Sequence, residues 1–571
     1  MPHPREEEEF LSLPFQEKLE FLYGLPARRK RDLILSSPEA ERLVQSFTPE
    51  TLFYTLKEIG VADAGDLLSL ALPEQIKSLF DLDCWDKDRP NLRRVREWLE
   101  ALVESGRKRM ADGLMELDIE LVSLLLRQYL KVHRVDEPQE TEAPFDNFVQ
   151  FGENYLIEYI RSDAIQPNIH EFLEEAFERD YAYFTGLMEE LYWGVEAELE
   201  EQAYLSRRSR LADRGFPDFF EAQSVFAYLN PQHFQELRSR YDPPIRDQLE
   251  ENDNLSPGVA PAMLGTENSL FNAALIAGFA AQGQRQLRSE MAAVSNQVLV
   301  ARAIDFGDLE AVRVAIEMTH NYMNLGLEHL AGGELKTAIE YLRDTHLQLL
   351  FRLGISLTID LRKRAELVVA KLGLQPNRTR EIAYLDSPYR EALAGFLQRQ
   401  PQFYGGLDRD GSVAMRDFRT MRDVHLSYAM LEQVDAMPDF FRMLLGLDIA
   451  SAPFRAHIAG HEIRLSQIAL TAFARYALER RLVFDPIEPE RLTALHHAMM
   501  SQGGRPARLG EDFRRLVQEA IAERLDDPLL RRSNDFLNSC LNALEEDLAE
   551  VDSRKPIDPR FIRSLLFRRP S

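Results

Sequence analysis

The sequence predicts a multi-domain, all-α protein in which an N-terminal array of short helices, wound as a superhelix, is followed by helical bundles. Apolar residues recur at helical spacing through most of the chain, and prolines after capping hydroxyls mark helix starts near the N-terminus. Sustained alternating runs bounded by Asn-Gly or Asp-Gly turns are absent from the sequence. The chain has 571 residues. At roughly 150 residues per domain this length predicts about three to four packed units.

Prolines divide the N-terminal part at nearly regular intervals, and the last interval is twice the length of the others. The positions are Pro14, Pro26, Pro38, Pro49 and Pro73. The dipeptides Ser37-Pro38 and Thr48-Pro49 each place a hydroxyl at the capping position and a proline at the first helical position. A glutamate follows in each case, where the helix dipole favours it. Both positions are predicted helix starts.

Each of these short helices has one apolar stripe. The stripes are Leu19, Leu22 and Tyr23, then Leu43, Val44 and Phe47, then Leu52, Phe53 and Leu56. A helix of this length cannot bury its stripe alone. The helices are therefore expected to stack into a superhelical array that ends near Arg109.

Turn-rich and charged segments predict the domain boundaries. The first module covers residues 1–110, and residues 111–250 form an acidic helical bundle with a linker at about 135–146 (VDEPQETEAPFD). The segment 241–261 predicts a second boundary, before a central helical domain over 255–484. The motif FDPIEPE at 484–490 precedes a C-terminal helical region over 485–571.

Charge is concentrated in the second module. The whole chain has 68 basic and 94 acidic residues, a net charge of −26. Residues 111–254 contain 12 basic and 32 acidic residues, a net charge of −20. Such a balance repels a phosphate backbone, so nucleic acid is not expected as a partner. The acidic module is either a solvated face or a face for a basic partner.

The cysteine content and the N-terminus predict a cytoplasmic protein. Two cysteines, Cys84 and Cys540, cannot build a disulfide framework and suit a reducing compartment. The first residues lack the apolar run of a secretory signal. The longest weakly polar stretch, residues 270–281, contains Asn272 and is shorter than the roughly 18–20 apolar residues that a membrane span needs. We expect a buried helix there and no integral membrane segment.

Three segments carry a resemblance to a known family. They are 72–85 (LPEQIKSLFDLDCW), 200–204 (EEQAY) and 210–217 (RLADRGFP). They resemble a bacterial family of uncharacterised helical proteins, domain of unknown function 6178. The resemblance covers most of the chain and implies a fold but no activity.

The proline-spaced helices of residues 11–80 are also similar to the cytosolic N-terminal superhelix of MgtE magnesium transporters. In those transporters the module lies beside a membrane channel and senses divalent cations. No transmembrane segment follows here, so transport is not carried over from that resemblance.

An acidic loop at 81–90 (DLDCWDKDRP) is a candidate site for a divalent cation. It places four carboxylates within eight residues: Asp81, Asp83, Asp86 and Asp88. Mg²⁺ and Ca²⁺ need clustered oxygen ligands of this kind. The alternative is an ordinary turn whose charges are neutralised by Lys87 and Arg89.

Two further patterns have metal-ligand spacing. His457 and His461 stand at i and i+4, which places them on one face of a helix if residues 452–478 are helical. Glu317 and His320 form a single Glu-x-x-His motif. Zinc needs a third protein ligand, and a di-iron bundle needs a second Glu-x-x-His motif, which the sequence lacks. The alternative is that these are ordinary core or surface histidines.

Three arginines after the acidic segment 189–201 are a candidate anion site. Arg207, Arg208 and Arg214 could converge on a phosphate or carboxylate, because guanidinium groups suit such anions. The alternative is a structural role, because acidic residues near the start of a helix and basic residues near its end both interact favourably with the helix dipole.

Sequence motifs of the common enzyme classes are missing. The chain has no Gly-x-Ser-x-Gly, no Gly-x-x-x-x-Gly-Lys, no His-Glu-x-x-His and no Cys-x-x-Cys. The sequence therefore predicts a non-enzymatic, cytosolic helical scaffold or regulatory adaptor that binds protein partners and needs no cofactor. The alternatives are a metal-dependent or anion-binding enzyme with a dispersed site, and a divalent-cation sensor.

Overall fold

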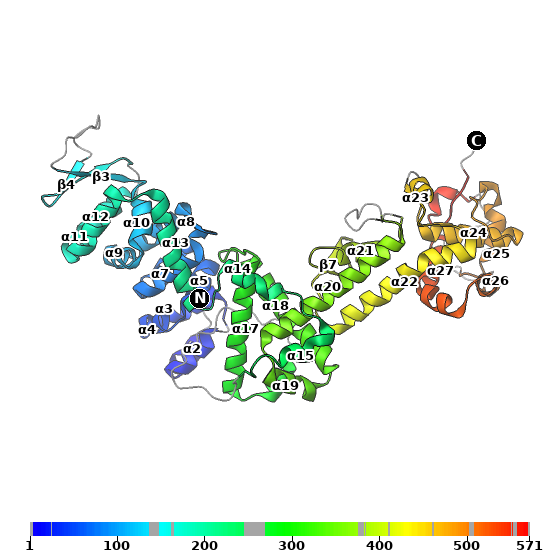
Figure 1. Ribbon diagram of the computed structural model, residues 1–571, viewed down its shortest axis with the longest axis horizontal. Helices are drawn as coiled ribbons and strands as arrows, with labels where there is room; N and C mark the ends of the chain where they lie inside the picture. The colour runs from blue at the N-terminus through cyan, green and yellow to red at the C-terminus, as the bar shows by residue number, and fades with distance from the viewer. Residues whose placement is uncertain are drawn as a thin grey trace. The chain divides into compact units, whose positions relative to one another are not determined.

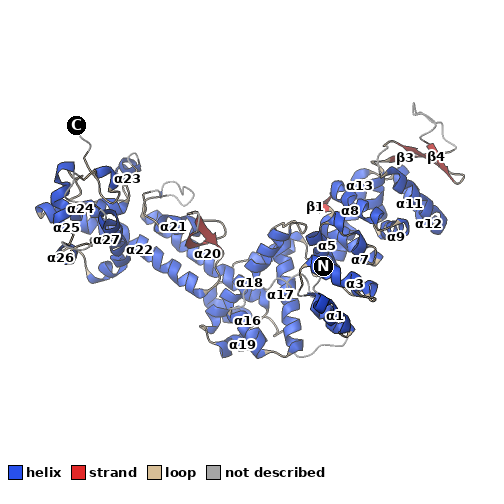
Figure 2. Cartoon of the chain, turned by 180° about the vertical axis from the view of Figure 1, so that it is seen from behind, coloured by secondary structure: helices blue, strands red, loops and turns tan. Residues whose placement is uncertain are grey.

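The computed structural model describes residues 4–23, 25–135, 148–161, 165–244, 269–374, 382, 384–408, 411–459, 462–501, 508–549, 551 and 557–568. Within these residues the chain forms 27 α-helices and seven short strands in three small sheets (Figures 1 and 2). The predicted all-α fold class is confirmed. Of the described helices, none combines the length and the apolar character that crossing a membrane requires.

The chain divides into two compact units. Unit 1 comprises Met1–Ala227 and Gln235–Arg352, and unit 2 comprises Tyr228–Phe234 and Leu353–Ser571. The main division falls inside one continuous helix, α20 (Leu347–Lys371), because residues on either side of it pack with different neighbours. A helix carries no turn residues at such a point, so composition does not indicate this division. The four-module division stays a prediction.

Unit 1 begins with the predicted array of short helices. Its elements are α1 (Pro4–Ser12), α2 (Phe15–Tyr23), α3 (Ala27–Ser36), α4 (Ala40–Gln45), α5 (Pro49–Ile59), α6 (Gly65–Leu68), α7 (Pro73–Asp83), β1 (Trp85–Asp86), β2 (Arg89–Pro90), α8 (Leu92–Glu104), α9 (Arg107–Glu116) and α10 (Ile119–Leu126). Alternate helices pack on one another, with α1 on α3, α3 on α5, α5 on α7 and α7 on α9 (Figure 1). This order is that of a superhelical array.

One of the two predicted helix starts is confirmed. Helix α5 begins at Pro49, and the Thr48 hydroxyl accepts a hydrogen bond from the Thr51 N–H at 3.1 Å. The start predicted at Pro38 is wrong by two residues, since α4 begins at Ala40. The Ser37 hydroxyl there accepts from the Glu39 N–H at 3.2 Å, so it caps a turn that precedes the helix.

The predicted stripes form the core of the array. Eight of their nine side chains are buried, and that of Tyr23 lies outside the described set. Trp98 of α8 lies between two phenylalanines, with its ring centroid 6.5 Å from that of Phe53 and 6.5 Å from that of Phe80. Burial of aromatic side chains of this size provides much of the hydrophobic stabilisation of such a module.

The acidic part of unit 1 contains a small antiparallel sheet as well as helices. Its elements are β3 (Leu130–Arg134), β4 (Phe148–Phe151), β5 (Tyr155–Tyr159), α11 (Gln166–Arg179), α12 (Tyr181–Trp193) and α13 (Glu196–Asp213). The strand order is β3-β5-β4, with Leu130 opposite Tyr159 and Phe148 opposite Glu158. The predicted linker lies between β3 and β4, and all of it except Val135 is outside the described residues.

The remaining helices of unit 1 pack as a bundle. They are α14 (Phe219–Ala222), α15 (Phe234–Arg238, whose first residue belongs to unit 2), α16 (Leu270–Gly278), α17 (Ala281–Ala301), α18 (Leu309–Ala331) and α19 (Leu335–Asp344). Helix α16 packs on α19, and α17 packs on α18. The helix predicted over residues 270–281 corresponds to α16, which is only partly buried: Phe271 and Leu275 are buried, whereas Ile276 is 69% exposed.

Unit 2 is a second helical assembly with one hairpin. After α20 it contains α21 (Tyr389–Phe396), β6 (Phe403–Leu407), β7 (Val413–Arg416), α22 (Met421–Leu445), α23 (Ala452–Ala459), α24 (Leu465–Glu479), α25 (Leu492–Met499), α26 (Glu511–Ala522) and α27 (Asp527–Ala549). Helix α27 packs on α22 and on α24, and α24 also packs on α25.

A buried arginine ties the segment 484–490 to α24 in unit 2. Arg475 is 4% exposed and donates to the backbone carbonyl oxygens of Asp485 at 3.0 Å and Pro486 at 2.6 Å. Its guanidinium also pairs with Glu479 at 2.9 Å and with Glu488 at 3.2 Å. The sequence predicts a domain boundary at this segment, and in the structure the segment packs against the preceding helix, α24.

Candidate functional site

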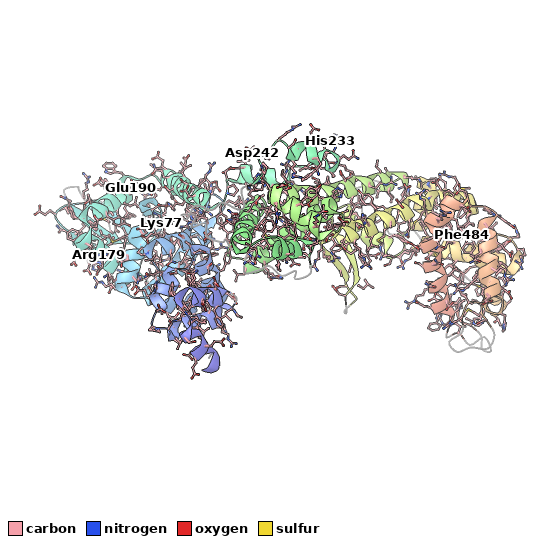
Figure 3. All side chains as sticks on the ribbon, turned by 90° about the horizontal axis from the view of Figure 1, so that it is seen from below. Lys77, Arg179, Glu190, His233, Asp242 and Phe484 are labelled. Carbon is pink, nitrogen blue, oxygen red and sulfur yellow. The ribbon has the colours of Figure 1, made fainter. Side chains whose placement is uncertain are left out.

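The acidic loop and the arginine-rich helix lie against each other in unit 1. Arg210 of α13 donates to both carboxylate oxygens of Asp81, at 2.8 and 2.7 Å. It also donates to both oxygens of Asp118, at 2.9 and 2.6 Å. Lys77 lies 3.4 Å from Asp118 (Figure 3, where Lys77 is labelled). One guanidinium thus joins α13 to the end of α7 and to the start of α10.

The loop predicted at 81–90 is wrong for its first residues, because Asp81 and Asp83 belong to the last turn of α7. Asp83, the second buried carboxylate, has three partners. Its side chain accepts from Lys57 Nζ at 2.9 Å and from the Trp98 indole at 2.8 Å, and Arg94 lies at 3.5 Å. Arg94 in turn pairs with Asp305. Gly307 lies so close that a Cβ atom there would be 2.4 Å from Asp83 Oδ1, so this approach requires glycine.

These contacts form two charge-balanced groups that meet on α7, one around Arg210 and one around Asp83, and together we call them the aspartate–arginine network. Its carboxylates are Asp81, Asp83, Asp118 and Asp305, and its cations are Lys57, Lys77, Arg94 and Arg210. Asp81 and Asp83 are each 2% exposed. A buried carboxylate is costly unless it is paired and hydrogen-bonded, and both of these are. The network therefore fixes how α5, α7, α8 and α13 pack.

The four aspartates proposed as cation ligands do not gather at one point. Asp81 and Asp83 are buried in the aspartate–arginine network, whereas Asp86 and Asp88 are exposed. Asp86 accepts a hydrogen bond from Asn91 at 2.9 Å. Among the residues that the structure describes, no three His, Cys, Asp or Glu side chains are placed to share a metal ion. Cation binding by this loop stays a prediction.

The three arginines proposed to bind an anion each contact a different group of the protein. Arg207 stacks on Trp85, 5.0 Å from the ring centroid, and donates to the backbone oxygen of Asp81 at 2.7 Å. Arg208 pairs with Asp218 at 3.2 Å, and Arg214 donates to the Ser78 hydroxyl. They do not converge on one position.

The sequence interpretation missed Arg210, which has the largest number of charged contacts in the cluster. The signal was present, because residues 207, 210 and 214 follow the i, i+3, i+7 spacing of one helix face. Three arginines on one helix face are compatible with two structures. The face can pack against carboxylates of the protein, or it can bind a free anion.

The remaining candidate metal ligands belong to two different units of the chain. His320 of α18 is buried, and its Nε2 lies 3.2 Å from Asn272 Oδ1. Glu317, one turn earlier, lies 3.7 Å from Arg313 on its own helix. His457 is exposed on α23 in unit 2, and His461 lies outside the described residues. Metal binding by these four residues stays a prediction.

We expect the stability of unit 1 to fall as the pH drops from 6.5 to 4 because of His320. Burial lowers the pKa of His320 to about 4, whereas a histidine in an unfolded chain has a pKa of about 6.5. Between pH 6.5 and pH 4 the unfolded state therefore binds more protons than the folded state. The contribution of His320 to the free energy of unfolding is complete above pH 6.5 and falls by about 1.4 kcal/mol for each pH unit below that value. Urea unfolding at pH 7 and at pH 4.5 measures this change in the free energy of unfolding.

The control for this pH dependence is His320→Gln, which cannot titrate. Between pH 7 and pH 4.5 the wild type should lose about 2–3 kcal/mol more than the variant. Equal losses in the two proteins would show that His320 does not carry this pH dependence.

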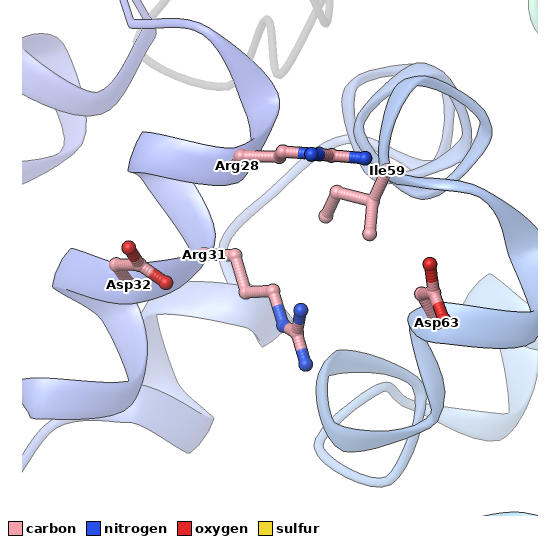
Figure 4. A pocket seen from close by; sticks show the side chains of 5 residues that line it. All are labelled: Arg28, Arg31, Asp32, Ile59 and Asp63. Carbon is pink, nitrogen blue, oxygen red and sulfur yellow. The ribbon is translucent and has the colours of Figure 1, made fainter. Parts of the chain in front are cut away.

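A polar pocket opens between α3 and the C-terminal end of α5 (Figure 4). Its volume is about 410 Å³, and its lining residues are Arg28, Arg31, Asp32, Ile59 and Asp63. Arg31 donates to Asp66 at 2.6 Å and is therefore already paired. Two arginines and two aspartates leave the lining without a net charge, so it favours neither an anion nor a cation.

The turn between α12 and α13 presents apolar side chains to solvent. Trp193 is 65% exposed, Val195 is 54% exposed and, farther along α13, Leu205 is 51% exposed. Three exposed glutamates lie among them in the chain. We call this region the Trp193 surface, defined by Trp193, Val195, Glu196, Glu198, Glu201 and Leu205.

A hydrogen-bonded arginine holds this turn in place. Arg127, at the end of α10, donates through Nη2 to the carbonyl oxygens of Glu190 at 2.9 Å and Leu191 at 3.3 Å, and also to that of Gly194. The Glu190 carbonyl also accepts from the backbone N–H of Gly194 at 3.0 Å, and the carbonyls of the last turn of α12 lie where a helix leaves such groups to be satisfied by other partners. Arg127 thereby sets the direction in which the chain leaves α12 (Figure 3, where Glu190 is labelled).

The indole of Trp193 is also held from its own helix. The ring of Tyr192 meets the Trp193 indole edge-on, with the two ring centroids 4.7 Å apart. Glu189 accepts from the Tyr155 hydroxyl at 2.8 Å and from Arg134 at 3.0 Å. The hydrogen bonds from Tyr155 and Arg134 hold the pKa of Glu189 below its usual value, so this acceptor stays ionised at neutral pH.

Comparison with known proteins identifies a family but no characterised relative. The family model described as "Family of unknown function (DUF6178)" matches residues 7–568. No curated protein and no protein of solved structure gives a significant match. The similarity of residues 11–80 to the MgtE superhelix is therefore not supported by a structural match and stays an expectation.

Proposed function

Because the chain belongs to the DUF6178 family of unknown function, which has no activity to carry over, we propose from its surface that it is a helical scaffold or adaptor that binds a protein partner in the cytosol. The observation that supports this proposal is the exposed Trp193, which lies against Tyr192 at the α12–α13 turn that Arg127 holds. Tryptophan is among the residues that most often dominate binding energy at protein interfaces.

The fixed geometry favours binding. A side chain that is ordered before association loses little conformational entropy when it is covered by a partner. Arg127 orders the turn, and the ring of Tyr192 packs edge-on against the indole. Covering the exposed part of the indole is then worth about 2–4 kcal/mol, which is the range of an interface hot spot.

The enzymatic and sensor alternatives have less support. Asp81 and Asp83 have cationic protein partners, and Arg207, Arg208 and Arg214 each contact a separate protein group. A catalytic or ligand site instead needs groups that converge on one concave position. These residues support a structural role in the platform that carries the Trp193 surface.

The experiment compares affinity-purified complexes of the full-length chain expressed in its native cells. Wild type, Trp193→Ser and Phe220→Ser are purified in parallel and their partners are quantified by mass spectrometry. Phe220 is the matched control, because it is 83% exposed and follows the far end of α13, about 27 Å along that helix from Glu196.

We expect at least one protein to be recovered equally with wild type and Phe220→Ser and at least tenfold less with Trp193→Ser. Circular dichroism spectra of the three proteins should coincide. The proposal fails if no recovered protein depends on Trp193, or if both substitutions reduce recovery equally.

A further inference from the structure

We propose that the partner docks on the Trp193 surface through a basic amphipathic segment, whose apolar side chains cover Trp193, Val195 and Leu205 while its lysines and arginines pair with the glutamates between them. This inference rests on the proposed adaptor function and names the chemistry of its partner.

The exposed residues form one stripe along α13. Glu198, Gln202 and Leu205 of α13 are all exposed, and their separations of four and three positions place them on one helix face. Val195, also exposed, is the capping residue directly before this helix. Ten residues of helix separate the two apolar ends by about 15 Å. An acidic side chain thus lies between two apolar contacts, which is the pattern complementary to an amphipathic segment with basic residues between its apolar ones.

The glutamates at this end of α13 lack counter-charges. Glu196, Glu198, Glu200 and Glu201 form no ion pair with any described residue. Glu196 and Glu200 stand at i and i+4, a spacing at which like charges repel on a helix. The dipole at the helix N-terminus stabilises the first-turn residues Glu196 and Glu198 but does not extend to the next turn.

Several carboxylates on the neighbouring acidic helices of unit 1 are paired with arginines. On α11, Glu174 and Glu175 pair with Arg107 at 3.4 and 3.3 Å, and on α12 Glu189 pairs with Arg134 at 3.0 Å. The start of α13 differs because its carboxylates remain available beside exposed apolar groups. Cationic side chains of a partner would supply the missing counter-charges and remove the repulsion.

Tryptophan fluorescence can test this inference directly. The chain has three tryptophans. Trp85 is 7% exposed and Trp98 is 1% exposed, so only Trp193, at 65%, is open to collisional quenchers. Because its surroundings are acidic, caesium should quench Trp193 more strongly than iodide, relative to free N-acetyltryptophanamide. Trp193→Phe should abolish most of the quenching by both ions.

The binding probe is a synthetic 18-residue amphipathic helical peptide of leucine and lysine, and the control peptide has glutamate at every lysine position. With the full-length protein, the lysine peptide should shift the Trp193 emission to shorter wavelength and lower its acrylamide quenching at least threefold. Binding should weaken as salt is raised. The glutamate peptide should have neither effect.

Two charge-reversal variants with the same net charge separate site binding from general attraction. Glu198→Lys/Glu201→Lys should weaken binding of the lysine peptide at least tenfold. Glu171→Lys/Glu178→Lys, on α11, should change it by less than twofold. Equal weakening by both variants, or binding without protection of Trp193, would overturn the inference.

The outcomes for the proposed function and for the partner chemistry are distinguishable. If the lysine peptide leaves Trp193 unprotected while a cellular partner still depends on Trp193, the basic-segment inference is wrong and the adaptor function stands. If neither the peptide nor any cellular protein depends on Trp193, both proposals fail.

Discussion

Replacing Arg210 with methionine is expected to lower the free energy of unfolding of unit 1 by about 3–5 kcal/mol. Methionine keeps an unbranched apolar stem but removes the charge and the hydrogen bonds to Asp81 and Asp118. Those carboxylates are 3% and 12% exposed, so water cannot replace the guanidinium. Breaking a buried pair from one side leaves an uncompensated charge, which costs more than the pair contributes.

The measurement is urea unfolding followed by tryptophan fluorescence. All three tryptophans belong to unit 1, so this signal reports on that unit. Arg208→Met is the matched control on the same helix, because the Arg208 side chain is 50% exposed in its pair with Asp218. An exposed pair of this kind contributes about 0–1 kcal/mol. Similar losses in the two variants would contradict the structural role assigned to the aspartate–arginine network.

Replacing Arg475 with methionine is expected to destabilise unit 2 by about 3 kcal/mol. The substitution removes the donors of two backbone carbonyl groups and a cation shared by Glu479 and Glu488. These carboxylates are 24% and 28% exposed, so partial hydration limits the loss. Arg475→Lys should recover only part of the stability, because an ammonium group cannot reproduce the planar set of donors.

Hydrogen exchange of peptides from α24 and from the segment 484–490 measures this loss. The tryptophan fluorescence transition of unit 1 should stay unchanged, since unit 2 contains no tryptophan. Arg481→Met is the control, because Arg481 is exposed and its substitution should change stability by no more than about 0.5 kcal/mol. A shift of the fluorescence transition as large as the change in α24 would show that the two units unfold together.

The sequence indicated some residues of the candidate site, but not which groups they contact. The carboxylates at 81 and 83 and the arginines at 207 and 214 were selected separately, as a cation site and an anion site. The structure instead brings the two segments into contact through Arg210, which lies 129 positions from Asp81. Composition identifies charged clusters, whereas their counter-charges lie on another helix.

The strands show a similar limit. Residues 130–134 and 155–159 pair as β3 and β5, although the sequence favoured helix throughout. Their backbone partners are up to 29 positions apart in the chain, so no window of neighbouring residues contains the pair. Trp193 was seen only as part of an acidic helix, because exposure is a property of the folded surface.

The sequence by itself determined the helical class, the start of α5 and the apolar stripes that form the N-terminal core. These features depend on hydrogen bonds and side-chain spacing within one or two helical turns, which local residues specify. Only the tertiary structure decided which charges are paired, where the chain divides and which tryptophan faces solvent. Those outcomes depend on contacts between helices far apart in the chain, where packing selects one arrangement among many that the same local pattern permits.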